Sequence, residues 1–146
     1  MTEKRLPRAV WSMVLESVPI ACTDVIVERN SQILLGLRVI EPYMNVWALP
    51  GGRILKNEHP EGAVERNLKE IGIRGELERF VGVFPVRFPN HPQRRYDITL
   101  CYKARWRSGE PKANAELARF RWVSPKSLPT RMGRNYRRMI LSAFST

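Results

Sequence analysis

The sequence is short of acidic residues and cysteine, and it has no long apolar run. Its 146 residues include 14 Asp and Glu against 25 Lys and Arg, which gives a formal net charge of +11 at pH 7. No apolar stretch approaches the roughly 18 residues of a membrane-spanning helix. The charged N-terminus also lacks the continuous apolar region of a signal peptide. We therefore expect a cytoplasmic protein that does not contact a membrane.

The two cysteines, Cys22 and Cys101, each lie in an apolar run that is typical of a strand. Cysteines in such surroundings are usually small buried thiols, and we expect the same here. A disulfide or a metal-binding pair is the alternative.

The excess of positive charge would attract polyanions, which include both nucleotides and nucleic acids. Arginine dominates the basic residues, and its planar guanidinium favours two-point contact with phosphate over diffuse attraction. Net charge alone does not decide between these two classes of partner.

The stretch 51–73 organises the sequence, because a glycine pair, a helix start and a glycine stop follow one another in it. Gly51 and Gly52 let the backbone turn sharply and approach a ligand closely. Pro60 suits the first position of a helix, and Gly72 suits the position just past the last turn.

The predicted helix has two useful faces. Val64, Leu68 and Ile71 follow the spacing of a buried stripe. Arg66 and Glu70 are four residues apart and project roughly from the opposite side. A carboxylate and a guanidinium that face a glycine loop suit a hard cation such as magnesium and the phosphates it carries.

At these positions the sequence resembles the Nudix hydrolase family. Gly52, Glu58 and Arg66 match the family's sequence box in residue type and spacing. Asn67 stands where the box has a glutamate, and the end of the box is one residue short, so that only Glu70 remains of a glutamate pair. The resemblance implies an α/β fold, the Nudix fold, in which a mixed β-sheet is sandwiched between helices as an α/β/α sandwich.

One branch of that family, the GDP-mannose mannosyl hydrolases, lacks the same first glutamate, and the chain looks like this branch over about residues 6–128. The resemblance implies hydrolysis of a nucleoside diphosphate sugar with Mg²⁺, for which Mn²⁺ is an alternative. The histidine that serves this branch as general base is replaced by Leu117. His91, in a proline-rich loop, is the candidate replacement, whereas His59 is expected to cap the helix or face solvent.

The resemblance implies three overlapping groups of site residues. The metal ligands offer oxygen atoms and are Gly51 (through its carbonyl), Glu70 and Glu116. The catalytic residues act on the charge of the diphosphate and are Arg53, Arg66 and Glu70. The substrate-binding residues are Asp24, Arg38, Arg53 and Tyr102.

Several of these residues have a structural alternative. Asp24 could be a buried aspartate whose hydrogen bonds are made within the fold, and Tyr102 could pack in the core. Glu116 could be an ordinary surface residue of its loop. Arg66 could pair with Glu58, as the Nudix box implies for these two positions.

Around the motif, hydrophobic periodicity predicts further elements. Helices are expected at about 8–17 and 133–144, and strands at 20–28, 33–37, 98–106 and 120–123, with 74–86 as one or two strands. We expect residues 1–146 to form one domain. The apolar helix 8–17 would pack on the body or on a second subunit, so a homodimer is an open alternative.

Three functions remain open. The leading one is Mg²⁺-dependent hydrolysis of a nucleoside diphosphate sugar by attack of water on the sugar carbon. The second is a pyrophosphohydrolase that acts on ADP-ribose or a nucleoside triphosphate. The third is a catalytically weak Nudix-fold protein that binds nucleotide or RNA, a partner that the positive charge allows without favouring.

Overall fold

The computed structural model describes residues 6–41 and 44–145. Within these residues the helices are α1 (Arg8–Ser17), α2 (Pro60–Glu70) and α3 (Arg134–Phe144). The strands are β1 (Ile20–Arg29), β2 (Gln32–Arg38), β3 (Trp47–Ala48), β4 (Gly51–Arg53), β5 (Arg74–Arg87), β6 (Tyr96–Ser108) and β7 (Leu117–Val123). The predicted helices are confirmed, and the run 74–86 belongs to a single strand, β5.

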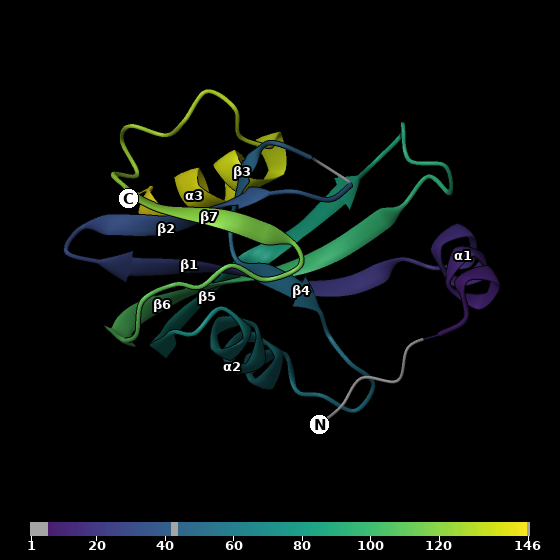
Figure 1. The fold of residues 1–146 in the computed structure, drawn as a ribbon, viewed down its shortest axis with the longest axis horizontal. Helices are drawn as coiled ribbons and strands as arrows, with labels where there is room; N and C mark the ends of the chain where they lie inside the picture. The colour runs from purple at the N-terminus through teal and green to yellow at the C-terminus, as the bar shows by residue number, and fades with distance from the viewer. Residues whose placement is uncertain (1–5, 42–43, 146) are drawn as a thin grey trace.

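The strands form one mixed sheet of seven strands, with the order β3-β2-β1-β6-β5 along its main path (Figure 1). β1 and β6 are parallel, whereas the other pairs are antiparallel. β4 pairs with the first half of β1, and β2 pairs with its last residues. This arrangement brings the glycine strand β4 directly beside Cys22, Thr23 and Asp24.

α2 and α3 cover opposite faces of the sheet (Figure 1). Val25 and Val27 of β1 share a buried cluster with Leu68 of α2. Ile26, between them in the sequence, belongs instead to the cluster that contains Ile140 of α3. Alternate residues of a strand point to opposite faces, so one strand supplies both layers of the core. The predicted α/β/α sandwich is therefore confirmed.

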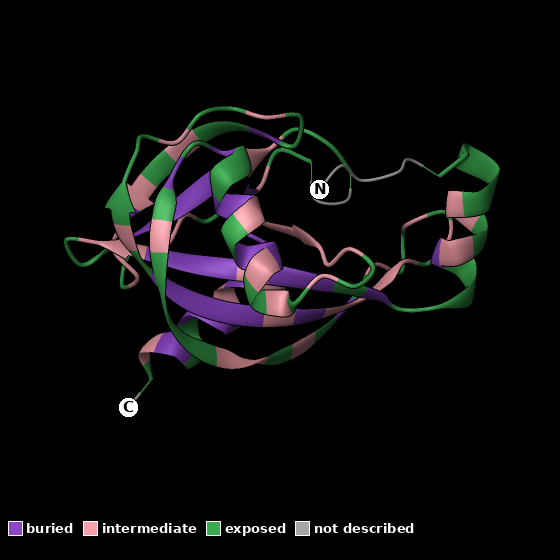
Figure 2. Cartoon of the chain, turned by 90° about the horizontal axis from the view of Figure 1, so that it is seen from below, coloured by how far each residue is buried: buried purple, intermediate pink, exposed green. Residues whose placement is uncertain are grey.

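α1 lies at one end of the molecule, away from α2 and α3 (Figure 1). Its Leu15 is buried against Ile20 and Cys22, and Trp11 packs beside them. Met13 is 65% exposed, and Figure 2 shows exposed and half-buried residues over most of this helix. α1 therefore covers the start of β1 and takes no part in the two main clusters.

Local predictions for the ends of α2 are confirmed. Pro60 is its first residue, and His59 caps it by accepting a hydrogen bond at Nδ1 from the Glu61 N–H, at 3.3 Å. Gly72 follows the helix with φ of +81°, a conformation that glycine adopts without strain. Cys22 and Cys101 are buried free thiols, as expected. Among the described residues, no helix has the length and apolar character needed to cross a membrane.

Candidate active site

A cavity of about 710 Å³ lies where the sheet meets α1, the first turn of α3 and the side of α2 that carries Arg66, Asn67 and Glu70. The predicted site residues that line it are Asp24, Arg38, Gly51, Arg53, Arg66, Glu70 and Glu116. The structure thus brings together side chains from β1, β2, β4, α2 and the segment before β7. Tyr102 is the predicted site residue that does not line the cavity.

Tyr102 lies on the face of the sheet that α2 covers. Its side chain is buried in the cluster that contains Val64 and Leu68, and its ring centroid is 5.2 Å from that of Phe80. Thr99, an odd number of residues away on the same strand, points to the other face and lines the cavity. Tyr102 thus packs in the core, as its structural alternative describes, and its contact with substrate stays a prediction.

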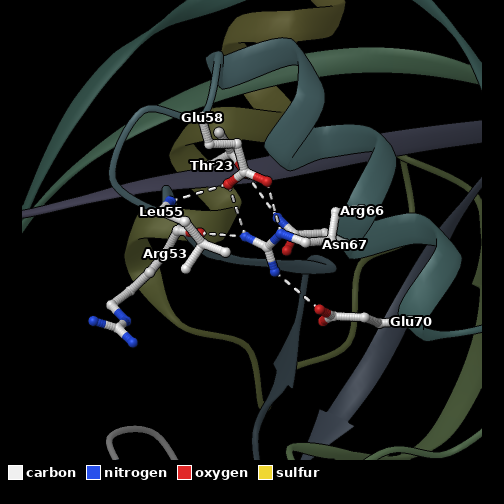
Figure 3. A network of polar contacts seen from close by, with 7 residues as sticks. All are labelled: Thr23, Arg53, Leu55, Glu58, Arg66, Asn67 and Glu70. Carbon is white, nitrogen blue, oxygen red and sulfur yellow. Dashed lines mark hydrogen bonds and ion pairs between the residues drawn. The ribbon is translucent and has the colours of Figure 1, made fainter. Parts of the chain in front are cut away.

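Arg66 ties the loop after β4 to α2 (Figure 3). Its Nε lies 2.8 Å from Glu58 Oε2, and its Nη2 donates to Glu58 Oε1 at 3.0 Å and to the Arg53 carbonyl at 2.7 Å. The hydrogen bond between the side chains holds the pKa of Glu58 below, and that of Arg66 above, its ordinary value. The Nη1 atom donates to Glu70 at 2.9 Å. All three nitrogens are thus engaged with protein groups, as the pairing alternative for Arg66 predicts.

Glu70 and Glu116 supply carboxylates at the rim of the cavity. Glu70 Oε1 accepts the bond from Arg66, and its side chain is 52% exposed. Glu116 Oε2 lies 4.0 Å from Arg38 Nη1, and its side chain is 49% exposed. Both carboxylates are therefore open to a ligand that enters from solvent.

The donor set fits magnesium that arrives with a phosphate ligand. Within the part of the chain that the structure describes, no group of three or more His, Cys, Asp or Glu could hold a metal ion. Mg²⁺ commonly keeps several waters and binds through one or two carboxylates together with substrate phosphates. Glu70, Glu116 and the backbone of Gly51 all line the cavity, and this sparse set of oxygen atoms suits that mode.

Asn67 occupies the interior of the site in place of the expected glutamate. Its Nδ2 donates to Thr23 Oγ1 at 2.8 Å, and its Oδ1 is buried with no hydrogen-bond partner among the described residues. A Cβ atom at Gly52 would stand only 2.9 Å from that oxygen. Glycine at this position therefore leaves the space that the amide occupies.

Asp24 lies in the cavity beside the glycine strand. Its Oδ2 accepts a hydrogen bond of 2.6 Å from Thr99 Oγ1. A Cβ atom at Gly51 would lie 2.5 Å from Asp24 Oδ1, so the two strands approach closely here. Burial disfavours the charged form and raises the pKa of Asp24 to about 7, although the Thr99 hydrogen bond acts in the opposite direction. Asp24 is thus satisfied within the fold and also lines the cavity.

Comparison with known proteins matches a family model, the NUDIX domain, to residues 19–143. The chain belongs to the Nudix hydrolase family. The crystal structure of the MutT NUDIX hydrolase from Burkholderia pseudomallei is similar, with a TM-score of 0.73 and 26% identity over 86% of this chain and 98% of that chain.

Two further relatives of this chain carry different functional names. The low-salt glycan biosynthesis protein Agl8 of Haloferax volcanii is 32% identical over 81 residues, which are 55% of this chain and 52% of Agl8. The ADP-ribose pyrophosphatase of Methanocaldococcus jannaschii is 30% identical over 112 residues, 76% of this chain and 65% of that protein. The Nudix chain thus spans about half the length of Agl8 and slightly less than two thirds of the second relative.

Sequence reasoning missed several residues that line the Nudix cavity, among them Trp11, Phe88, Arg95, Thr99 and Asn135. The Arg53 guanidinium lies over the Trp11 ring, 4.5 Å from its centroid. Arg95 is held by Asp97, with 2.8 Å between Nε and Oδ1. These residues come from α1, the β5–β6 connection, β6 and α3, outside the Nudix box, so the motif contained no signal for them.

Two positions bear on the identity of the general base: Leu117, which stands where the mannosyl hydrolase branch has its histidine, and His91, the candidate replacement. Leu117 is buried, and a Cβ atom at Gly36 would lie 2.8 Å from its Cδ1. His91 lines the cavity, and its Nδ1 accepts a hydrogen bond from the Gln93 N–H at 3.2 Å. In the neutral ring Nε2 then carries the proton, so His91 presents a donor to a ligand. This bond argues against His91 as the replacement base.

Proposed function

We propose that this Nudix hydrolase cleaves nucleoside diphosphate sugars with Mg²⁺, by attack of water on the sugar carbon and departure of the nucleoside diphosphate. The number of carboxylates left in the Nudix helix carries the proposal. Glu58 accepts two hydrogen bonds from Arg66 and its side chain is only 10% exposed, and Asn67 is neutral. Glu70 accepts one bond from Arg66 and is half-exposed, so it is the carboxylate of the box that remains for a cation. Attack at phosphorus draws on several carboxylates to hold metals and activate water. Attack at carbon needs fewer carboxylates, because the leaving diphosphate takes up the developing negative charge.

In this proposal Glu70, Glu116 and the Gly51 carbonyl hold the Mg²⁺, with Mn²⁺ as an alternative. The bound ion supplies positive charge that stabilises the leaving diphosphate. Arg38 and Arg53 donate charge-assisted hydrogen bonds to the phosphate oxygens.

The electrostatics around Arg53 support an anion in the cavity. Burial and the positive charges of Arg95 and Arg66 lower the pKa of Arg53. A phosphate group beside Arg53 would offset this repulsion and the loss of hydration. Asp24, which Thr99 holds in place, accepts a hydrogen bond from a substrate hydroxyl in the same proposal.

Turnover is expected to be slow. His91 presents a donor, and Leu117 occupies the position of the histidine base in the mannosyl hydrolase branch. A well-placed general base contributes roughly 10²–10⁴ in rate. The reaction proposed here therefore depends mainly on the stabilisation of the leaving group.

A pyrophosphohydrolase acting on ADP-ribose or a nucleoside triphosphate is the second candidate. The similarity to the ADP-ribose pyrophosphatase of M. jannaschii over 76% of this chain favours it. The two reactions differ in the atom that receives the oxygen of water, so the products distinguish them directly.

The test is a turnover assay with Mg²⁺ on GDP-mannose, GDP-glucose and ADP-ribose in ¹⁸O water, with the products identified by mass spectrometry. Label in the released sugar, lost in Glu70→Gln, supports the proposal. Glu65→Gln is the matched control, because Glu65 is exposed on the same helix and does not line the cavity. Label in a phosphate moves the protein to the pyrophosphohydrolases, and the absence of turnover on all three compounds rejects both reactions for them.

A further inference from the structure

Two buried acceptor atoms lack a hydrogen-bond partner among the described residues, and both belong to residues of the same cavity. They are the Oδ1 atoms of Asn67 and Asn135. Buried polar atoms in folded proteins are nearly always paired. Both oxygens are therefore candidates to accept a hydrogen bond from a ligand in this cavity.

The two asparagines differ in their freedom to turn. Asn67 is held by its bond to Thr23, within the Nudix box. Asn135 is half-buried in the first turn of α3, outside the box. The Cβ–Cγ torsion of asparagine has a broad energy profile, so a modest rotation can turn Oδ1 toward a ligand without moving the helix. A Cβ atom at Gly133 would come within 2.8 Å of this oxygen, so glycine there leaves it room.

The cavity that Asn135 lines has an apolar wall. Leu49, Val86 and Tyr136 belong to the buried cluster on the α3 side, Phe88 packs against it, and all four line the cavity. Ligand sites commonly combine such a wall with a few polar groups that fix orientation. A sugar ring fits this wall, because its C–H faces are apolar and its hydroxyl groups lie at the edges.

The chemistry of the Asn135 Oδ1 acceptor indicates which part of the ligand can bind to it. An amide oxygen accepts hydrogen bonds and cannot donate them, and ionised phosphate oxygens also only accept. The diphosphate is therefore unsuited to Asn135 Oδ1, whereas a sugar hydroxyl can donate to it. A nucleobase N–H and the ribose hydroxyl groups are the other donors of such a substrate. For the base, however, the Trp11 ring on the α1 side of the cavity offers a stacking surface.

We infer that Asn135 is a specificity-determining residue, which accepts a hydrogen bond at Oδ1 from a sugar hydroxyl of the substrate. This inference rests on the proposed nucleotide-sugar function and names the contact that would recognise the sugar. A site built to bind a hydroxyl discriminates against analogues that lack it, because its buried acceptor is then left unpaired.

The experiment compares GDP-mannose with analogues that each lack one hydroxyl of the mannosyl unit. Wild type, Asn135→Leu and Asn135→Asp are measured on every compound. Asn135→Leu removes the acceptor at similar size, whereas Asn135→Asp keeps one. Ser142→Ala, on the exposed side of the same helix, is the control for a general effect on α3. Thermal unfolding of each variant reports whether the fold is retained.

We expect Asn135→Leu to lower kcat/KM for GDP-mannose roughly tenfold, the loss typical of one hydrogen bond. On the analogue that lacks the bound hydroxyl, wild type and Asn135→Leu should react equally. Asn135→Asp should keep the discrimination between GDP-mannose and that analogue. Ser142→Ala should match wild type on all compounds.

Equal effects of Asn135→Leu on every analogue, or no effect on any, would overturn the inference. If the loss disappears instead with inosine diphosphate mannose, which lacks the guanine amino group, the contact is to the base and the sugar assignment is wrong.

The products formed by the wild-type protein test the proposed function independently of Asn135. If wild type cleaves ADP-ribose at phosphorus, the same comparison is made with ADP-ribose and its deoxyribose analogues. If nothing is turned over, calorimetric affinities for GDP-mannose and its analogues replace kcat/KM, and absence of binding rejects both ideas.

Discussion

Asn67 donates a hydrogen bond from Nδ2 to Thr23 Oγ1, 2.8 Å away, and this bond joins α2 to β1 inside the Nudix site. The neighbouring Gly52 has no side chain that could obstruct the amide. The bond holds a neutral group at a position where the Nudix box has a carboxylate. The charge at this one position is therefore one unit less negative than in a complete box.

Asn67→Asp should strengthen divalent cation binding. The substitution adds one negative charge beside Glu70, and the affinity of a site for hard cations rises with the charge of its ligands. We expect Mn²⁺ to bind roughly tenfold more tightly, since about 1.4 kcal/mol corresponds to a factor of ten. Titration of the free protein with Mn²⁺, followed by electron paramagnetic resonance, measures this. Unchanged affinity in a folded variant would show that Asn67 does not adjoin the cation.

Arg66→Lys should destabilise the protein by about 2 kcal/mol, because an ammonium cannot span both oxygens of Glu58 and also reach the Arg53 carbonyl. For a chain of this size the loss corresponds to a decrease in Tm of about 4–8 °C. Arg107→Lys is the matched control, since Arg107 pairs with Glu76 at the surface, where the side chains are 52% and 61% exposed. Calorimetry should show little change in the Tm of the control. An equal decrease in Tm in the two variants would show that the contacts of Arg66 do not stabilise the protein more than a surface ion pair does.

Asp24 should make the metal-free protein less stable as pH rises. Its pKa is raised from 3.8 to about 7 on folding, so the unfolded chain releases this proton first. The stabilising contribution is complete below about pH 4 and is lost as pH rises through about 7. In EDTA, Tm should therefore decrease over this interval more strongly in wild type than in Asp24→Asn. Parallel Tm profiles for the two proteins would show that Asp24 is not the group responsible.

Gly36→Ala should destabilise the sheet beneath Leu117. The new Cβ atom would lie 2.8 Å from Leu117 Cδ1, and overpacking of this kind costs about 1–3 kcal/mol. Leu117→Ala removes the opposing methyl groups. The double variant should therefore be more stable than the sum of the two single effects predicts, by about 1 kcal/mol. Urea denaturation of the four proteins measures this coupling, and strict additivity would argue against the contact.

Sequence reasoning was accurate where neighbours along the chain decide the structure. Pro60 and Gly72 delimit α2 because helix ends depend on the backbone properties of single residues. The ion pair of Glu58 with Arg66, which the resemblance to the Nudix box implied as an alternative, is also present. Tyr102 shows the limit of this reasoning. Alternation along β6 sorts its residues into two faces, but it does not say which face is covered by α2 and which lines the cavity.

The glycine pair Gly51 and Gly52, which was predicted as a loop, belongs instead to strand β4. The amino-acid sequence was enough to predict the family, the helices, most of the strands and the shortage of carboxylates in the Nudix box. These properties follow from residue types and their spacing along short stretches of the chain. Three results needed the folded structure: Tyr102 packs under α2, Asn67 binds Thr23, and Asn135 of α3 lines the cavity of the Nudix motif. Each of these results depends on contacts between segments that are distant in sequence. Such contacts are set by the packing of both helices on the sheet, which local patterns do not specify.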